Sequence, residues 1–380
     1  MAVPAHVTQK GMKGVVCHGI QDYRLHEDLP LPKLNHGDIL LRVRAVGICA
    51  GDAKCFAGAP YFWGKEGHPQ YVQPPVIPGH EICGDIVAFG GEENEETPPM
   101  SGTFCGAQVA VGDRVVVEQI APCWSCHLCR RGRYNLCIPH SVFGFRQDVQ
   151  GAMAEFVKVP ARGLVYKISS KIPSHHAAFA EPLACSLHAV ELGNIKSYEV
   201  VVVSGCGPLG LGCIAGAKRK NARLVMALDL LPDKLELARA SGADVVVNPA
   251  QEDAQARVLE LTGGLGCDVY IEVAGNPASV TQGLKMCGRG AKFVEFSVFG
   301  RETTCDWTTI SDAKELTVQG GHLSLHTFPA AVRLIEEGAL PLDKIVTHVL
   351  PLERFKEGID LVNDSKNSIK VCLLPHAHAD

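Results

Sequence analysis

Beginning near residue 198, short apolar segments alternate with helical segments, and this alternation constrains the fold more than any other feature of the chain. EVVVVSG is typical of a strand buried on both faces, and the LGLGCIAGAKRK that follows it is typical of a helix. RLVMALDL, DKLELARASGA, DVVVNP and CDVYIEVAG continue the pattern. Strands interleaved with helices predict a parallel sheet that is covered on both faces. We therefore expect a doubly wound α/β domain here.

A glycine-rich turn joins the first of these strands to its helix. Gly205, Gly207 and Gly210 form the pattern G-x-G-x-x-G, and Pro208 and Leu209 stand between the last two glycines. With a strand before it and a helix after it, such a turn lets the backbone approach a pyrophosphate at the positive end of the helix. We interpret it as the cofactor-binding turn of a Rossmann domain. A tight turn without a ligand is the alternative.

Asp229 ends the next strand, 19 residues after Gly210. An acidic side chain in this place accepts hydrogen bonds from the ribose hydroxyls of adenosine and repels a 2′-phosphate. This predicts NAD rather than NADP as the cofactor. Lys234, near the start of the following helix, is a further candidate for cofactor contact.

The first half of the chain has a different pattern. DILLRVRAVGIC, HEICGDIVAFG and VGDRVVVEQI are short apolar segments that end in turn residues, which indicates a compact β-rich domain. A chain of 380 residues is also too long for one typical core. The sequence therefore predicts two domains, one β-rich and one with a parallel sheet.

Composition excludes several classes of partner. Charged residues make up 20% of the chain and the net charge is −5, which gives no electrostatic basis for binding nucleic acid or an anionic membrane. We find no apolar run long enough to span a bilayer and no apolar signal segment at the start. We therefore expect a cytoplasmic protein whose 16 cysteines serve as thiols and metal ligands rather than as disulfides.

Four cysteines lie within APCWSCHLCRRGRYNLC, at Cys123, Cys126, Cys129 and Cys137. Four thiolates in one short loop can close a tetrahedron around zinc and leave no position for water or substrate, so we interpret this loop as a structural metal site. A disulfide pair is disfavoured in the cytosol, and an iron–sulfur cluster is the other alternative. The neighbouring His127, Arg130, Arg131 and Arg133 either offset the negative charge of such a site or form a solvated basic face.

Further candidates for chemistry are spread along the chain. Cys49 and Asp52 stand in VGICAGDAKCF, His80 and Glu81 stand in IPGHEICGDIV, and FAEPLACSLHAV contains Glu181. Their order, together with VGDRV, the four-cysteine loop and the glycine-rich turn, resembles the zinc-dependent medium-chain dehydrogenases/reductases. The resemblance extends over nearly the whole chain and is strongest to the polyol and L-threonine dehydrogenase branch.

This resemblance implies a fold and a set of site residues. It implies a GroES-like catalytic domain with both zinc sites at 1–178, a Rossmann NAD-binding domain at 179–323, and a return to the catalytic domain at 324–380. The catalytic zinc would be bound by Cys49, His80 and Glu181, with Glu81 as a fourth, exchangeable ligand. Asp52 would orient His80. The zinc would polarise a substrate hydroxyl whose carbinol hydrogen passes to the nicotinamide.

The charge of this set of zinc ligands and the residue at position 51 both bear on how the proton of the alcohol would be transferred. With Cys49, Glu81 and Glu181 charged, a zinc shell sums to −1, so we hypothesise that Glu81 leaves the metal or that Glu181 accepts the alcohol proton. Many relatives also carry Ser or Thr two residues after the cysteine ligand, where this chain has Gly51. Lys54, His68 or Glu181 would then have to serve as the relay. An exposed charge and an ordinary loop residue are equally plausible interpretations of Lys54 and His68.

The segment AGAPYFWGKEGHPQYVQPPVIPG separates Cys49 from His80. Its Tyr61, Phe62 and Trp63 are candidates for the wall of a substrate pocket, or for a lid or subunit contact; Glu66 and His68 are candidates for binding hydroxyls. Together with FSVFGRETTCDW, this segment resembles the erythritol/threitol dehydrogenase group.

We therefore expect an NAD-dependent oxidoreductase that contains two zinc ions per chain and oxidises a secondary hydroxyl of a small polyol. L-Threonine, butanediol and longer sugar alcohols are alternative substrates, and a non-catalytic nucleotide-binding relative is the alternative of another class. The resemblance also implies a homodimer or a homotetramer. Nucleic acid and membranes are not expected as partners.

Overall fold

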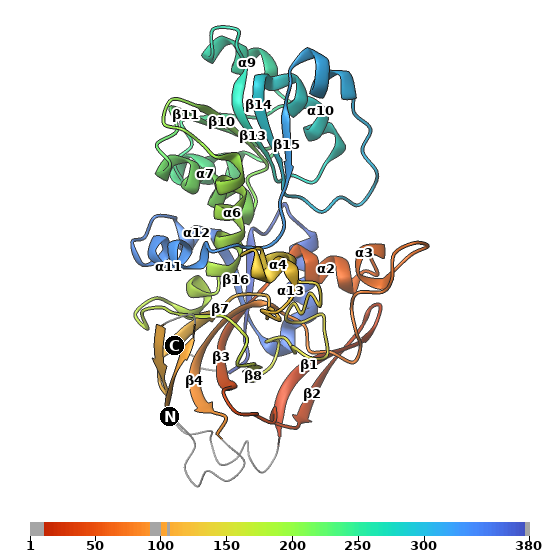
Figure 1. Ribbon diagram of the computed structural model, residues 1–380, viewed down its shortest axis with the longest axis vertical. Helices are drawn as coiled ribbons and strands as arrows, with labels where there is room; N and C mark the ends of the chain where they lie inside the picture. Colours follow the sequence, from red (N-terminus) through yellow and green to blue (C-terminus); the bar gives the residue numbers. More distant parts are fainter. Residues whose placement is uncertain (1–10, 92–99, 105–106, 377–380) are drawn as a thin grey trace. The chain divides into compact units, whose positions relative to one another are not determined.

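The computed structural model describes residues 11–91, 100–104 and 107–376, and the chain divides into two compact units (Figure 1). Unit 1 combines Met1–Glu181 with Val346–Asp380, and unit 2 consists of Pro182–Ile345. The last segment of the chain thus belongs to the same unit as the first. The functional division at residues 178 and 323 stays a prediction.

Unit 1 is built on a seven-stranded sheet. Its order is β16–β17–β3–β4–β7–β9, and β8 also pairs with β3. Neighbouring strands are antiparallel, except β16 and β17, which are parallel. The strands are β3 (Ile39–Ile48), β4 (Glu81–Phe89), β7 (Arg114–Val117), β8 (Phe156–Val159), β9 (Val165–Lys167), β16 (Val346–Pro351) and β17 (Lys370–Leu374).

The position of β3 and β4 at the centre of this sheet follows from their composition. Both are rich in apolar residues on both faces, and nearly all of their side chains are buried. The start of β4 lies beside the end of β3, because the two strands are antiparallel and Gly47 pairs with Glu81. On the other side of β3, Val371 of β17 pairs with Ile48. Three segments far apart in the sequence therefore meet at the end of β3.

Smaller elements surround the unit 1 sheet. Two hairpins are formed by β1 (Met12–Gly19) with β2 (Asp22–Leu29) and by β5 (Ser101–Phe104) with β6 (Ala107–Ala110). The helices are short: α2 (Ala50–Phe56), α3 (Pro60–Trp63), α4 (His127–Arg130), η1 (Tyr134–Leu136), α5 (Ser174–Ala177), η3 (Leu352–Arg354) and α13 (Phe355–Asn363). The boundary between the units falls in the first turn of α6 (Ala180–Gly193).

Unit 2 contains a six-stranded, wholly parallel sheet in the order β12–β11–β10–β13–β14–β15. Its strands are β10 (Val200–Ser204), β11 (Leu224–Leu228), β12 (Val245–Val247), β13 (Cys267–Glu272), β14 (Cys287–Glu295) and β15 (Thr317–Gly320). The other elements are α7 (Pro208–Arg219), α8 (Pro232–Ala240), α9 (Ala254–Leu261), α10 (Pro277–Met286), η2 (Thr309–Ala313), α11 (Phe328–Glu336) and α12 (Leu342–Ile345).

In chain order this sheet reads 3-2-1-4-5-6, which is the strand order of a dinucleotide-binding Rossmann domain. Its strands are buried apolar runs, and a cluster that includes Val202, Met226, Tyr270 and Phe293 forms the core between sheet and helices. The prediction of a doubly wound parallel sheet joined to a β-rich part is confirmed. None of the helices in the described residues has the length and apolarity needed to cross a membrane.

Candidate active site and metal centres

Cys49 stands where β3 ends and α2 begins. It is the N-cap of α2, and its Sγ accepts a hydrogen bond from the backbone N–H of Gly51 at 3.3 Å. Asp52 closes the turn in the other direction, because its Oδ2 accepts from the backbone N–H of Cys49 at 2.9 Å. The reciprocal bonds form a capping box. The cysteine thiol is thus held by local backbone geometry rather than by a flexible loop.

The structure brings His80 and Glu81 to this thiol. The candidate ligand atoms of Cys49, His80 and Glu81 all lie within 4.8 Å of one another. His80 is 6% exposed and Glu81 is 1% exposed. A Cβ at position 47 would lie 1.8 Å from Glu81 Oε2, so only glycine leaves room for this carboxylate beside β3. Sulfur, imidazole nitrogen and carboxylate oxygen are the donors that zinc takes in catalytic sites, so these residues fit the metal.

The imidazole of His80 lies beside the carboxylate of Asp52. His80 Nδ1 and Asp52 Oδ1 are 3.4 Å apart, and neither atom makes a hydrogen bond within the described part of the chain. Burial alone lowers the pKa of His80, but the negative charges of Asp52 and Cys49 outweigh this effect and the pKa is raised well above its ordinary value. The site therefore attracts positive charge, which a bound cation supplies in place of a proton.

Lys370 is a residue of this site that the sequence analysis missed. It is the first residue of β17 and only 3% exposed. Its Nζ lies 2.5 and 2.6 Å from the two carboxylate oxygens of Glu81 and donates to the carbonyl of Ile48 at 3.2 Å. Burial lowers the pKa of Lys370, but the negative charges of Glu81 and Cys49 raise it by more than burial lowers it. The net shift of this pKa is therefore upward. A lysine at the start of the apolar run KVCLL was the only signal in the sequence.

Glu181 and Lys54 were predicted to take part in the same site. Glu181 is a buried residue of the first turn of α6, and it is not among the residues whose ligand atoms lie within 4.8 Å of one another. Lys54 lies on α2, where burial lowers its pKa in spite of the opposing charge of Cys49. Both roles stay predictions.

Aromatic rings connect α3 to the candidate metal ligand His80. Phe62 is buried and stacks on Phe145, with ring centroids 5.1 Å apart at 17°. The ring of Phe145 lies 5.4 Å from that of His80. Trp63 instead donates its Nε1–H to the carbonyl of Cys55 at 2.7 Å. Of the predicted aromatic wall, Phe62 is thus linked to His80 through Phe145, which the sequence analysis did not name.

The other predicted pocket residues lie farther out. Tyr61 is 54% exposed and meets Phe62 edge-on, and Glu66 and His68 are exposed. At Gly51 an added Cβ would lie 3.6 Å from Cys49 Sγ and 3.8 Å from the ring of Phe62. The missing hydroxyl side chain therefore leaves free space between the thiol and the aromatic stack.

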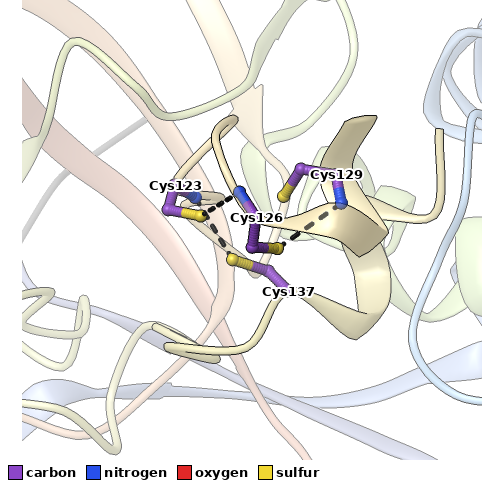
Figure 2. A group of neighbouring side chains, drawn as sticks. All are labelled: Cys123, Cys126, Cys129 and Cys137. Atoms are coloured by element: carbon purple, nitrogen blue, oxygen red, sulfur yellow. Dashed lines mark hydrogen bonds between the residues drawn. The ribbon is translucent and has the colours of Figure 1, made fainter. Parts of the chain in front are cut away.

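The four-cysteine loop forms a second cluster, in which the sulfur atoms of Cys123, Cys126, Cys129 and Cys137 all lie within 4.8 Å of one another (Figure 2). Backbone N–H groups point at three of the sulfurs. Cys123 N–H donates to Cys137 at 3.2 Å, Cys126 N–H to Cys123 at 3.3 Å, and Cys129 N–H to Cys126 at 3.5 Å. Such bonds favour thiolates.

The pKa values of two of these thiols are shifted in opposite directions. Hydrogen bonds from Ser125 lower the pKa of Cys123 to about 6, whereas burial raises that of Cys129 to about 12. Four thiolates this close repel one another unless a cation neutralises them, and a tetrahedral zinc fits this donor set. His127 and the three arginines at positions 130, 131 and 133 are exposed.

Hydrogen bonds join the four-cysteine loop to residues that flank the unit 1 sheet, one just after β7 and one between β8 and β9. The hydroxyl of Tyr134 donates to the buried carboxylate of Glu118 at 3.1 Å, and Trp124 Nε1–H donates to the carbonyl of Arg162 at 2.8 Å. The loop is thus built into the unit rather than free, which agrees with a structural site.

The glycine-rich turn of unit 2 has the geometry of a nucleotide site. Gly205 has φ +101°, and a Cβ on Gly210 would lie 1.8 Å from the carbonyl oxygen of Gly205. Gly207 is the N-cap of α7 and supplies no side-chain cap, and a Cβ there would meet open space. The first turn of α7, which contains Pro208 and Leu209, is therefore open to an anion.

Asp229 follows β11 directly and lies against this turn. Its Oδ2 accepts from the backbone N–H of Cys206 at 2.8 Å, and its Oδ1 accepts from that of Leu231 at 3.0 Å. Lys234 is half-buried, and its charge acts on Cys206 in the turn. The residues predicted to bind the cofactor thus lie together in unit 2.

Comparison with known proteins places these sites in context. Residues 35–170 match the alcohol dehydrogenase GroES-like domain, and residues 208–337 match the zinc-binding dehydrogenase domain. The chain is 51% identical to the erythritol/L-threitol dehydrogenase of Mycolicibacterium smegmatis over 96% of this chain and 98% of that one. It is 33% identical to the L-threonine 3-dehydrogenase of Bacillus velezensis over 92% and 94% of the two chains. The crystal structure of 2R,3R-butanediol dehydrogenase from Bacillus subtilis superposes with a TM-score of 0.80 at 30% identity, covering 96% of this chain and all of that one.

Proposed function

Because this chain belongs to the zinc-containing alcohol and polyol dehydrogenases, we propose that it oxidises a secondary hydroxyl of erythritol or threitol to the ketose and reduces NAD. The observation that carries the proposal is the buried group of Cys49, His80 and Glu81 in a chain that is 51% identical to an erythritol/L-threitol dehydrogenase. L-Threonine and butanediol are the alternative substrates, supported by the relatives that bear those names.

In the proposed reaction, Cys49 and His80 hold the catalytic zinc and Asp52 orients the imidazole of His80. A zinc bound there would polarise the substrate hydroxyl and stabilise negative charge on its oxygen. Glu81 is proposed as an exchangeable ligand, which would give up its position to the substrate. Glu181 is proposed as a further ligand or as the acceptor of the hydroxyl proton, and Lys54 as a member of the proton path.

A second zinc is proposed at the four cysteines, where it stabilises the loop and takes no part in the chemistry. NAD is proposed to bind at the glycine-rich turn of unit 2, with its ribose hydroxyls on Asp229. We also propose a homodimer or homotetramer in the cytoplasm, where a reducing environment keeps the metal-binding thiols free.

The reaction is tested by following NADH formation with erythritol and with L-threitol, and by identifying the product as a ketotetrose. Cys49→Ser is expected to lower kcat by about 100-fold or more, because it removes a zinc ligand. Cys55→Ser is the matched control, since Cys55 is a buried thiol of the same helix outside the metal cluster. A Cys49→Ser enzyme as active as the control would contradict the assignment. Zinc and NAD binding without any polyol oxidation would favour the non-catalytic alternative.

A further inference from the structure

Lys370 forms an ion pair with Glu81, which is also a candidate metal ligand. The lysine and the metal would therefore compete for the same carboxylate. Both oxygens of Glu81 lie within 2.6 Å of Lys370 Nζ. A carboxylate oxygen of Glu81 also lies within 4.8 Å of the candidate ligand atoms of Cys49 and His80. The carboxylate therefore lies between the ammonium group of Lys370 and the position that a metal ion would take. Its distance to the ammonium is already that of a strong charge-assisted hydrogen bond.

The ammonium group has a fixed position. Lys370 begins β17, which pairs with β3, and its Nζ also donates to the carbonyl of Ile48. The carboxylate is seated just as firmly, because Gly47 leaves the space that Glu81 occupies. The backbone of three consecutive strands of the sheet, β17, β3 and β4, therefore fixes both members of the pair.

Stability alone is a weak reason for such a pair. A buried ion pair costs so much desolvation that well-packed apolar residues in its place are often as stable or more stable. Here the Glu81 carboxylate also requires a glycine at position 47, near the end of β3. The pair includes a candidate metal ligand, Glu81. This points to a role for Lys370 in determining whether Glu81 is bound to the metal.

We propose that Lys370 is a positioning residue, which holds the Glu81 carboxylate and keeps it an exchangeable rather than a permanent ligand of the metal. The proposal rests on the zinc site of the proposed function and adds the residue that controls it. When substrate arrives, Glu81 can leave the metal without becoming an unpaired buried charge, because Lys370 already pairs with it. Lys370 is the one basic residue in the described part of the chain that forms an ion pair with Glu81, so without it the carboxylate would turn to the metal.

The test uses the full-length enzyme with zinc, and with cobalt in its place. In Lys370→Met, zinc release to a chelator from the substrate-free enzyme is expected to slow by about 10-fold, because Glu81 then stays on the metal. The visible spectrum of the cobalt enzyme is expected to shift toward that of a site with one more ligand. Lys370→Arg, which keeps the charge, should restore both properties. Lys366→Gln is the matched control, an exposed lysine in the same segment.

A double variant separates the proposed role from a structural one. Adding Glu81→Gln to Lys370→Met removes the competing carboxylate, so release rate and spectrum are expected to match those of Glu81→Gln alone. Lys370→Gln, which retains a polar group for the carbonyl of Ile48, replaces Lys370→Met if that variant does not fold. Unchanged metal release and cobalt spectrum in a folded Lys370 variant would overturn the proposal. Both readouts need no substrate, so failure of the substrate assignment is seen separately as the absence of polyol oxidation.

Discussion

The two carboxylate oxygens of Asp229 accept hydrogen bonds from the backbone N–H groups of Cys206 and Leu231. The charge is thus fixed beside the glycine-rich turn, where the extra phosphate of NADP would meet it. Asp229→Asn retains an oxygen for one of the N–H groups and removes the charge. We expect it to reduce the preference for NAD over NADP by about 100-fold, since close charge repulsion in a partly buried site costs a few kcal/mol. The ratio of kcat/KM for the two cofactors measures this.

Combining Asp229→Ser with Leu230→Arg should move the preference further toward NADP, because Leu230 is 60% exposed and an arginine there has room. Equal kcat/KM for the two cofactors in the wild-type enzyme would show that Asp229 does not select between them.

Glu295 predicts a dependence of stability on pH that is independent of the metal sites. It ends β14, opposite Glu272 of β13, and burial together with that neighbour raises its pKa from 4.5 to about 8. A raised folded-state pKa means that the native state holds the extra proton, so the stabilisation is complete below pH 4.5 and is lost as the pH rises toward 8. Glu295→Gln resembles the protonated form at every pH.

The variant Glu295→Gln is therefore expected to gain stability over wild type as the pH rises from about 5 to 8.5, by on the order of 1–2 kcal/mol once partial exposure of Glu295 is taken into account. Melting temperatures of the two proteins at several pH values provide the comparison. A constant difference across this range would mean that Glu295 titrates normally.

At the scale of elements, the four-cysteine loop is expected to govern stability more than chemistry. Tyr134 and Trp124 bind it to residues that flank β7, β8 and β9, so loss of the metal should destabilise this part of unit 1. Cys123→Ser should lower the zinc content to one per chain and reduce the melting temperature by several degrees. Cys305→Ser, a cysteine outside both clusters, is the control. A Cys123→Ser enzyme with its full melting temperature and no turnover would mean that the loop is catalytic.

The elements of unit 2 were predictable because their signal is local. VVVV followed by G-x-G-x-x-G and a helix predicts a parallel strand with an anion-binding turn, and the alternation of strands with helices predicts the parallel sheet. The order 3-2-1-4-5-6 of its strands is seen only in the structure. The pairing of Lys370 with Glu81 was not predictable in this way. The two residues are 289 positions apart, and they meet because β3 pairs with β17 on one side and with β4 on the other.

The aromatic contact of His80 was not predictable from the local sequence either. Tyr61, Phe62 and Trp63 are conspicuous as a run, yet the ring that touches His80 belongs to Phe145, which stands in an ordinary turn sequence. The candidate metal ligands themselves were predicted from the joint order of their motifs. Cys49, His80 and Glu81 are individually unremarkable.

At the scale of the whole molecule, two metal sites of different openness should lose zinc at different rates. The four-thiolate site is closed, whereas the site at Cys49 and His80 must exchange ligands during turnover. A chelator such as phenanthroline is expected to remove one zinc per chain and abolish activity while the melting temperature stays nearly unchanged, and added zinc should restore turnover. Metal analysis that finds one zinc or none in active enzyme would disprove the two-site account.

The central claim is that this chain is a dehydrogenase of four-carbon polyols. The most direct measurement compares kcat/KM with NAD for erythritol, L-threitol, sorbitol, 2,3-butanediol and L-threonine under the same conditions. A site that pairs each hydroxyl of a tetritol should reject analogues that lack those hydroxyls, because its buried polar groups are left unpaired. The account predicts that a tetritol exceeds every other substrate by at least about 10-fold. A higher kcat/KM for sorbitol or L-threonine would contradict it.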